Sequence, residues 1–306
     1  MHMRVVCANH GALPFASPAP SDEDLIAAVR LQEDAGLDVV TDGQPSWTDP
    51  FTPVLGALDG VRLGHPAALP LGLTVRARPI VQAKLRRHRA PLAAAFQRAA
   101  AHARRPLKAV LTGPYTLSQA AEIATTAYHD RAALAFDLST VLAQEITALT
   151  AAGATVIQID EPLLLSRPAD ARVVRALLEP LVDAAIGATT IIATYGADAG
   201  PCYAQLNSLP GDIVALDCAG HPEVLAAIAA TGAGKPLALG VVSGVLNAVE
   251  DSAELARTVE RLLTRYVHDE VWLQPSRGMQ TLTRELAGAK LIALARAAQE
   301  LQSSAR

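Results

Sequence analysis

The sequence predicts one α/β domain over residues 1–306, folded as a (β/α)8 TIM barrel. Short β-branched runs alternate with long stretches of helical period rich in Ala, Leu, Arg and Glu, and eight strand–helix units can be counted. Such alternation implies parallel strands with right-handed crossovers, and eight units close into a barrel of roughly 250 residues or more. Hydrophobic residues make up 51% of the chain and charged residues 18%, enough apolar material for a large core.

The strands are expected where short apolar runs follow a polar or glycine-containing turn. They are Arg4–Cys7, Asp38–Thr41, Leu107–Leu111, Thr155–Ile159, Thr189–Ala193, Ile213–Leu216, Leu237–Val242 and Val271–Leu273. The main helices are expected at Asp22–Ala35, Arg131–Ala152, Ala169–Ile186, Pro222–Ala230, Ser252–Tyr266 and Arg284–Leu301. The regular spacing breaks between Thr41 and Leu107, where we expect a rim insertion after the second strand: a strand pair around Leu71–Val81 and a basic helix.

Charge and composition exclude several classes of protein. The formal net charge is −4, which gives no electrostatic footprint for nucleic acid. The first residues are too short and polar for a signal peptide, and no apolar run approaches the roughly 20 residues of a membrane span, so a cytoplasmic protein is expected. Three cysteines without a CxxC pair indicate no disulfide framework. The basic run Lys84–Arg89 is interpreted as a solvated helix face or a patch for a polyanionic substrate tail.

Active sites of TIM barrels lie at the carboxyl ends of the strands. The run Val156–Ile159 is followed there by two adjacent carboxylates, Asp160 and Glu161. Buried carboxylates are paired or functional, so they could serve in acid/base chemistry. A structural alternative stays open, in which one caps the next helix and the other pairs with an arginine. His10 also follows a strand and could orient a substrate or act as acid or base, or be a loop residue bonded to backbone.

Five motifs, in order along nearly the whole chain, resemble the catalytic barrel of the cobalamin-independent methionine synthases. They include Ile157-Gln158-Ile159-Asp160-Glu161-Pro162, which is similar to that family's signature, and the run Leu111-Thr112-Gly113-Pro114. The others are His10-Gly11-Ala12-Leu13-Pro14, Asp42-Gly43-Gln44 with the residues before it, and Gln274-Pro275-Ser276-Arg277-Gly278. The chain is most like the short, single-barrel members of the family.

The resemblance implies a zinc ion held by His, Cys, Glu and Cys, but the corresponding positions of this chain differ. They hold Thr194, Gly196, Asp217 and Arg277, so zinc is not expected and no metal ligand is assigned. A relocated site made by Cys202, Cys218 and Asp217 is conceivable, although adjacent residues of a strand point to opposite faces. Gln44 stands where the family has a carboxylate, and Ser243-Gly244-Val245 replaces its Asp-x-His.

The resemblance and these departures together favour a zinc-independent methyl transferase with a small, non-thiol, anionic acceptor. The donor would be 5-methyltetrahydrofolate or a methylated corrinoid protein. The expected catalytic residues are Asp160, Glu161 and His10. The expected substrate-binding residues are Gln44, Trp47, Thr112, Tyr115, Thr194, Asp217, Ser243 and Arg277. Trp47 could stack on a pterin ring, and Arg277 could hold an anion through two parallel hydrogen bonds.

Other interpretations stay open at this stage. Trp47 and Tyr115 could be packing residues, and Arg277 could form an ion pair with Asp217. The chain could be a metal-free lyase or decarboxylase of the uroporphyrinogen-decarboxylase type, where arginines bind substrate carboxylates. It could also be a non-catalytic ligand-binding barrel or a true methionine synthase. The identity of a bound ligand would separate these classes.

Overall fold

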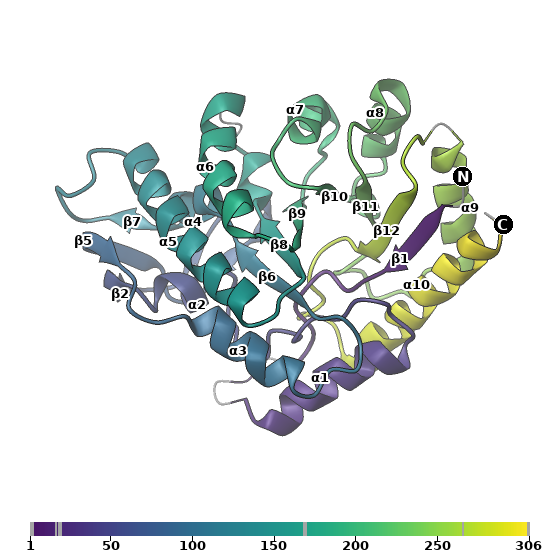
Figure 1. Ribbon diagram of the computed structural model, residues 1–306, viewed down its shortest axis with the longest axis horizontal. Helices are drawn as coiled ribbons and strands as arrows, with labels where there is room; N and C mark the ends of the chain where they lie inside the picture. Colours follow the sequence, from purple (N-terminus) through teal and green to yellow (C-terminus); the bar gives the residue numbers. More distant parts are fainter. Residues whose placement is uncertain (1–2, 16, 18–19, 168–169, 265, 305–306) are drawn as a thin grey trace.

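The computed structural model describes residues 3–15, 17, 20–167, 170–264 and 266–304. Seven parallel strands form one curled sheet in the order β1, β12, β11, β10, β9, β8, β6, with helices on its outer face (Figure 1). Their bounds are β1 Arg4–Cys7, β6 Lys108–Thr112, β8 Val156–Asp160, β9 Thr189–Thr194, β10 Ile213–Asp217, β11 Leu237–Val242 and β12 Glu270–Pro275. Seven of the eight predicted strands are therefore confirmed, and the α/β barrel class with them.

The eighth predicted strand, Asp38–Thr41, closes the barrel without forming a regular strand. Val39 makes an isolated parallel bridge to Ala8, and Val40 makes one to Leu107. The amide of Lys108 donates to the carbonyl of Val40 at 2.7 Å, and the amide of Asn9 donates to the carbonyl of Val39 at 3.2 Å. The segment thus joins β1 to β6 and takes the place of the eighth strand.

Ten α-helices and three 3-10 turns lie within the described residues. The α-helices are α1 Asp22–Asp34, α2 Thr52–Leu55, α3 Pro91–Ala100, α4 Pro114–Ala120, α5 Arg131–Ala151, α6 Ala171–Ala184, α7 Tyr203–Asn207, α8 Glu223–Thr231, α9 Ser252–Leu263 and α10 Arg284–Ser304, and the 3-10 turns are η1 Pro70–Gly72, η2 Pro162–Leu164 and η3 Gly200–Cys202. The six predicted helices are confirmed with ends shifted by at most three residues, although Ala169, the predicted start of α6, lies outside the described residues. Side-chain caps set several starts: Ser21 forms a capping box with Asp24, and Asp130 accepts from the amide of Ala133.

Helix α5 is long and apolar enough to span a membrane by length and composition. It packs against α3, α4 and α6, and half of its apolar window is buried inside the protein. A core helix of a folded protein meets the same length and composition test, so the packing accounts for its hydropathy.

The interior of the barrel contains a separate apolar cluster of small and β-branched side chains. Most of its members occupy early or middle positions of the strands: Val6, Ala8, Val39, Val156, Ile191, Ala193, Ile213, Ala215, Ala238 and Trp272. Apolar packing thus fills the base of the barrel, as in other barrels of this type. Polar side chains remain for the carboxyl ends of the strands.

The predicted rim insertion is present, but its basic run is not helical. β5 (Pro79–Arg86) pairs antiparallel with β2 (Asp59–Leu63) and parallel with the short β7 (Glu122–Ile123). A small hairpin of β3 (Ala67–Ala68) and β4 (Thr74–Val75) lies between β2 and β5 in the chain. The interpretation of Lys84–Arg89 as a helix face was wrong, because its first three residues belong to β5 and helix α3 begins only at Pro91.

Arg87, in this basic run, has a buried partner. Arg87 pairs with the buried carboxylate of Glu145 on α5, with Nη2 2.8 Å from Oε2. The other oxygen of Glu145 accepts from the amides of Leu92 and Ala93 at 2.8 and 3.3 Å, in the first turn of α3. This carboxylate therefore joins the insertion, α3 and α5 at one buried point.

We expect Arg87→Ala to lower the free energy of unfolding by about 3–5 kcal/mol, because it leaves the Glu145 carboxylate buried without its cation. The neighbouring Arg86 is exposed, so Arg86→Ala should change the stability by no more than about 0.5 kcal/mol. Denaturant unfolding of both variants measures the difference. Equal effects would show that the ion pair contributes nothing to the fold.

Candidate active site at the mouth of the barrel

A pocket that is open to solvent lies at the carboxyl ends of β1, β8 and β12. Its lining residues are His10, Gly11, Ala12, Gln44, Trp47, Pro50, Leu73, Asp160, Tyr195, Arg277, Gly278 and Gln280. Five predicted site residues meet in this one place although they come from distant parts of the chain: His10, Gln44, Trp47, Asp160 and Arg277. Parallel strands bring their carboxyl ends to the same edge, which explains the convergence.

The other predicted site residues lie outside this lining, and the contacts of three of them hold nearby loops. The Thr112 hydroxyl donates to the carbonyl of Pro50 at 2.6 Å. The Tyr115 hydroxyl donates to the carbonyl of Arg167 at 2.5 Å, and the Ser243 hydroxyl oxygen accepts from the amide of Leu246 at 3.1 Å. These three residues shape the rim around the pocket.

Glu161 is fully buried beside the first turn of α4. Its carboxylate accepts from the amides of Tyr115 at 2.9 Å and Thr116 at 2.7 Å. A Cβ at Gly113 would lie 2.3 Å from its Oε1, so only glycine fits there. Burial raises the pKa of Glu161 to about 7, against the lowering effect of the bonds from Thr116 and Tyr115. Glu161 thus binds the first turn of a helix, but the helix is α4, which precedes it in the chain, and not the next helix as the structural alternative proposed.

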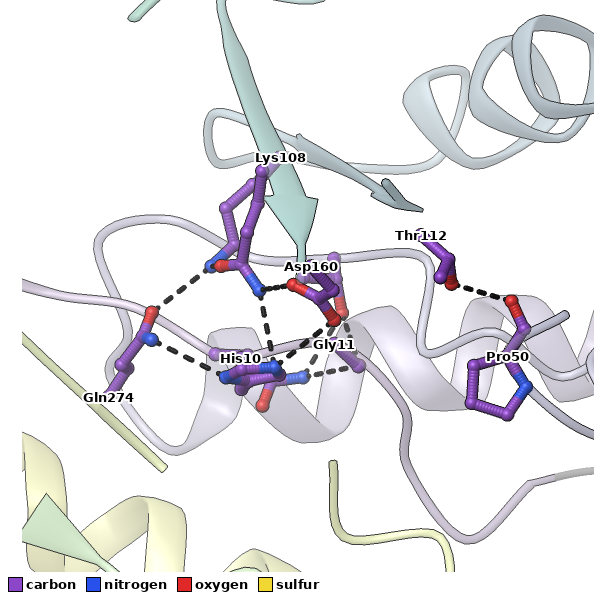
Figure 2. A network of polar contacts seen from close by, with 10 residues as sticks. His10, Gly11, Pro50, Lys108, Thr112, Asp160 and Gln274 are labelled. Carbon is purple, nitrogen blue, oxygen red and sulfur yellow. Dashed lines mark hydrogen bonds and ion pairs between the residues drawn. The ribbon is translucent and has the colours of Figure 1, made fainter. Parts of the chain in front are cut away.

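Asp160 behaves differently, because its carboxylate reaches the pocket. Its Oδ1 accepts from the side-chain amide of Gln158 at 2.7 Å, and its Oδ2 lies 3.4 Å from Nε2 of His10 (Figure 2). A polar carboxylate held by several donors at the end of a strand is suited to bind or deprotonate a ligand.

Tyr195 joins the two sides of the pocket. Its ring lies edge-on to His10 with the centroids 5.1 Å apart, and the guanidinium carbon of Arg277 lies 5.3 Å from its centroid. Burial, and then the charge of Asp160, raise the pKa of the Tyr195 phenol well above its usual value, while Arg277 opposes this. The phenol is therefore neutral at physiological pH and can donate a hydrogen bond.

Arg277 is a candidate anion-binding residue. Within the described part of the chain it forms no ion pair with a carboxylate. The alternative pairing with Asp217 is wrong, because the two oxygens of Asp217 accept instead from the amides of Gly196 at 3.3 Å and Gly220 at 2.8 Å. A guanidinium that lines a pocket and lacks a protein carboxylate can bind an anionic group of a ligand with two hydrogen bonds.

The residues at the family's zinc positions do not fit a zinc ion. Of Thr194, Gly196, Asp217 and Arg277, only Asp217 offers an anionic ligand, and Arg277 adds a positive charge. Gly196 has a φ of +86°, so a cysteine there would be strained, and an ideal Cβ would already lie 3.3 Å from that of Leu71. Among the described residues, no three His, Cys, Asp or Glu side chains gather as metal ligands.

The relocated metal site considered from the sequence does not form. Cys218 lies in the apolar core, where burial, then the charge of Asp217, raise the pKa of its thiol to about 12. Its Sγ donates to the carbonyl of Leu216, and the Sγ of Cys202 donates to the carbonyl of Ala199. Thiols held in this way are not thiolate ligands.

The segment Asp42–Trp47 brings two side chains to the opposite wall. Gln44 has a φ of +54°, a conformation that non-glycine residues seldom adopt. Its backbone amide donates to the Oδ1 atom of Asp42 at 3.1 Å. Such strain concentrates at functional sites. Burial raises the pKa of Asp42 to about 6. The backbone amide of Trp47 donates to the carbonyl of Gln44 at 3.0 Å and closes this turn, and Trp47 lines the pocket.

Sequence reasoning missed two buried polar residues directly below the pocket. Lys108 begins β6, and its ammonium donates to the side-chain oxygens of Gln158 at 2.5 Å and Gln274 at 3.2 Å. Burial lowers the pKa of Lys108 to about 7, against the opposing charge of Asp160. The signal was present in the sequence, because a lysine and a glutamine interrupt runs that otherwise read as fully buried strands.

Comparison with known proteins agrees with this architecture. Residues 13–300 match the family model described as "Cobalamin-independent synthase, Catalytic domain". A methionine synthase of Saccharolobus solfataricus is 27% identical over 278 residues, covering 89% of this chain and 82% of that protein. A methionine synthase of Methanothermobacter marburgensis is 27% identical over 283 residues, covering 89% of this chain and 87% of that protein.

Two solved structures share the fold. A B12-independent methionine synthase from Shewanella sp. W3-18-1, in complex with selenomethionine, superimposes with a TM-score of 0.80 at 20% identity, over 99% of both chains. A methyltransferase from Methanosarcina mazei gives a TM-score of 0.64 at 15% identity, over 96% of this chain and 93% of the other. At these identities the likeness shows the barrel fold alone.

The pKa of Glu161 predicts a pH dependence of stability. In the folded protein the group keeps its proton up to about pH 7, whereas in the unfolded chain it releases it near its ordinary value of 4.5. The folded state binds more protons between these values, so this contribution to stability is present at low pH and is lost as the pH rises towards 7. Glu161→Gln cannot titrate and should remove the decline.

We expect the difference in unfolding free energy between the wild type and Glu161→Gln to change by about 1–3 kcal/mol between pH 5 and pH 7.5. Denaturant unfolding at the two pH values measures it. Glu260→Gln, at an exposed position of α9, serves as the matched control and should show no such change. A difference for Glu161→Gln that does not vary with pH would contradict the assignment.

Proposed function

Because the chain belongs to the cobalamin-independent methionine synthase family, we propose that it is a zinc-independent methyltransferase with a non-thiol acceptor. Its relatives include methionine synthases and a structurally similar methyltransferase, which supports an enzyme that transfers methyl groups. The acceptor in this proposal is a small molecule with an anionic group, and the protein acts in the cytoplasm.

The proposal is supported by Arg277, a cation that lines the pocket at a position that the resemblance assigns to one of the family's metal ligands. The family uses zinc to lower the pKa of a thiol, so that a thiolate attacks the methyl group. With Arg277 and Thr194 at these positions, a thiol in this pocket would lack that activation. An amine or a carbon acid can instead be deprotonated by a carboxylate, and Asp160 is the carboxylate that lines the pocket.

In this proposal Arg277 and Asp160 bind different groups of the acceptor. The guanidinium would hold the anionic group of the acceptor by two parallel hydrogen bonds, while Asp160 would take a proton from the reacting atom or hold a ligand N–H. The ring of Tyr195 packs edge-on against His10, which lies beside Asp160, and also contacts the Arg277 guanidinium, so it helps to hold the two groups relative to each other. Gln44, neutral where the family has a carboxylate, makes this wall less selective for an ammonium group.

The methyl donor in this proposal is 5-methyltetrahydrofolate, with a methylated corrinoid protein as the alternative. A pterin ring is flat and carries N–H groups. Trp47 at the pocket edge offers a surface for such a ring, and the Asp160 carboxylate offers an acceptor for its N–H groups.

A lyase or decarboxylase remains the second candidate. The specific observation in its favour is the same unpaired Arg277, which could bind a substrate carboxylate in a site without a metal. The two candidates differ in product: one yields a methylated acceptor and tetrahydrofolate, and the other yields carbon dioxide or an unsaturated fragment without consuming a donor.

The test of the function combines binding and turnover. Calorimetric titration with 5-methyltetrahydrofolate should show saturable binding, and incubation with a labelled methyl donor should transfer label to small carboxylates that carry an amine or an acidic C–H. Methionine formation from homocysteine at a comparable rate would contradict the proposal and indicate a true methionine synthase. Release of carbon dioxide without a donor would favour the lyase.

We expect Arg277→Lys to weaken acceptor binding by about 1–3 kcal/mol, the range for charge-assisted hydrogen bonds, because lysine keeps the charge but loses the planar pair of donors. Titration of the acceptor identified in the turnover test measures the effect. Arg284→Lys is a matched control, since Arg284 also lies over an aromatic ring, that of Phe15, and is absent from the pocket lining. Unchanged affinity in Arg277→Lys would exclude Arg277 as the anion anchor.

A further inference from the structure

A closed ring of polar side chains lies beneath the pocket and connects β6, β8 and β12 to the segment after β1 (Figure 2). Lys108 donates to the oxygens of Gln158 and Gln274. The amide nitrogen of Gln158 lies 3.2 Å from Nε2 of His10, and that of Gln274 lies 3.4 Å from Nδ1 of the same ring. Asp160 completes the ring through Gln158 and His10.

The orientation of both glutamines follows from the chemistry of Lys108. An ammonium group donates hydrogen bonds and accepts none, so the atoms that face it must be the amide oxygens. Each glutamine then turns its NH2 group away from Lys108 and towards His10. The lysine therefore determines which groups surround the imidazole, although the two residues share no hydrogen bond.

This arrangement favours one pattern of donors and acceptors at His10: a proton on Nε2 opposes one neighbour, the NH2 group of Gln158 at 3.2 Å, whereas a proton on Nδ1 mismatches two, Gln274 and Asp160. NH2 groups face both ring nitrogens, while Oδ2 of Asp160, an acceptor, lies 3.4 Å from Nε2. If the imidazole proton is on Nε2, that N–H can donate to Oδ2 of Asp160. The unprotonated Nδ1 can then accept from the NH2 group of Gln274. The NH2 group of Gln158 then uses Asp160 Oδ1, at 2.7 Å, as its acceptor. A proton on Nδ1 would point at the NH2 group of Gln274, leaving two buried donors opposed.

We propose that Lys108 is a positioning residue that holds His10 in the neutral tautomer with its proton on Nε2. In this state the lone pair of Nδ1 is occupied by Gln274, and Nε2 donates to Asp160. His10 therefore does not act as a base towards the ligand. It orients Asp160, which is left as the basic group of the pocket. This assigns His10, predicted as acid/base or orienting, to the orienting role.

The burial of Lys108 supports a positioning role. Its side chain is 1% exposed, and within the described residues it has amide oxygens but no carboxylate in ion-pair contact. A buried cation without a counter-ion reduces stability, so its presence calls for another reason. Lys290, which is also fully buried, has Glu250 at 2.9 Å. The lowered pKa of Lys108 does not disturb the pattern, because a neutral amine still has two N–H groups for the two glutamines.

The experiment is nitrogen-15 NMR of the whole chain labelled at histidine, with correlations through two bonds that distinguish the two ring nitrogens. The signal of His10 is assigned by its loss in His10→Gln. In the wild type we expect the Nε2–H tautomer in at least about tenfold excess, a ratio that one satisfied hydrogen bond can sustain. The result concerns His10 alone, so it stands or fails separately from the proposed methyl transfer.

Lys108→Met, of similar length but without donors, frees both amides to rotate. We expect the single-tautomer pattern to be lost in this variant, while Lys290→Met, which removes the other buried lysine, leaves the His10 pattern unchanged. Gln274→Glu replaces the NH2 group at Nδ1 by a carboxylate oxygen, so a proton should appear on Nδ1. This second variant tests the ring even if Lys108→Met does not fold.

Three results would overturn the inference. The first is a wild-type His10 that carries its proton on Nδ1. The second is a His10 pattern in folded Lys108→Met identical to that of the wild type. The third is a Gln274→Glu protein in which Nδ1 still has no proton.

Discussion

The closure of the barrel between β1 and β6 is the constraint on which the site depends. The segment Asp38–Thr41 makes this closure with two isolated bridges and five backbone hydrogen bonds. It places Asp42 and Gln44 directly beside the end of β1, so that the strained turn at Gln44 faces His10 and Gly11. The seven strands and this segment all run parallel, so residues from opposite ends of the chain, such as His10 and Arg277, meet at the same end of the barrel.

At this end of the barrel, two adjacent carboxylates have different roles: one lines the pocket and the other stabilises a helix. Asp160 is the last residue of β8 and reaches the pocket. The next residue, Glu161, points away from the pocket and is buried against the first turn of α4. Beneath Asp160, Lys108, His10 and two glutamines form a ring whose donors and acceptors match best with the imidazole proton on Nε2. A ligand would therefore meet a floor that presents one carboxylate, with a guanidinium on the wall.

The sequence was sufficient for much of this architecture. Strand–helix alternation predicted the barrel, and strand-end position predicted that His10, Asp160 and Arg277 would converge. It could not separate Asp160 from Glu161, since the two adjacent carboxylates differ only in the direction of the backbone after the strand. The basic run Lys84–Arg89 was misassigned because its charges obscure the alternation of β5, where Val81 and Leu85 are the buried residues. Lys108 and Gln158 were overlooked because the apolar residues around them dominate the pattern.

The central claim is that a cation and a carboxylate, and not a metal, form the chemistry of this pocket. The most direct measurement is the zinc content of the purified chain by elemental analysis after dialysis, with Arg277→Cys analysed in parallel. The account predicts much less than one zinc per chain in both proteins, because Thr194 and Gly196 supply no ligand even when a cysteine is restored at position 277. Near-stoichiometric zinc in the wild-type chain would contradict it.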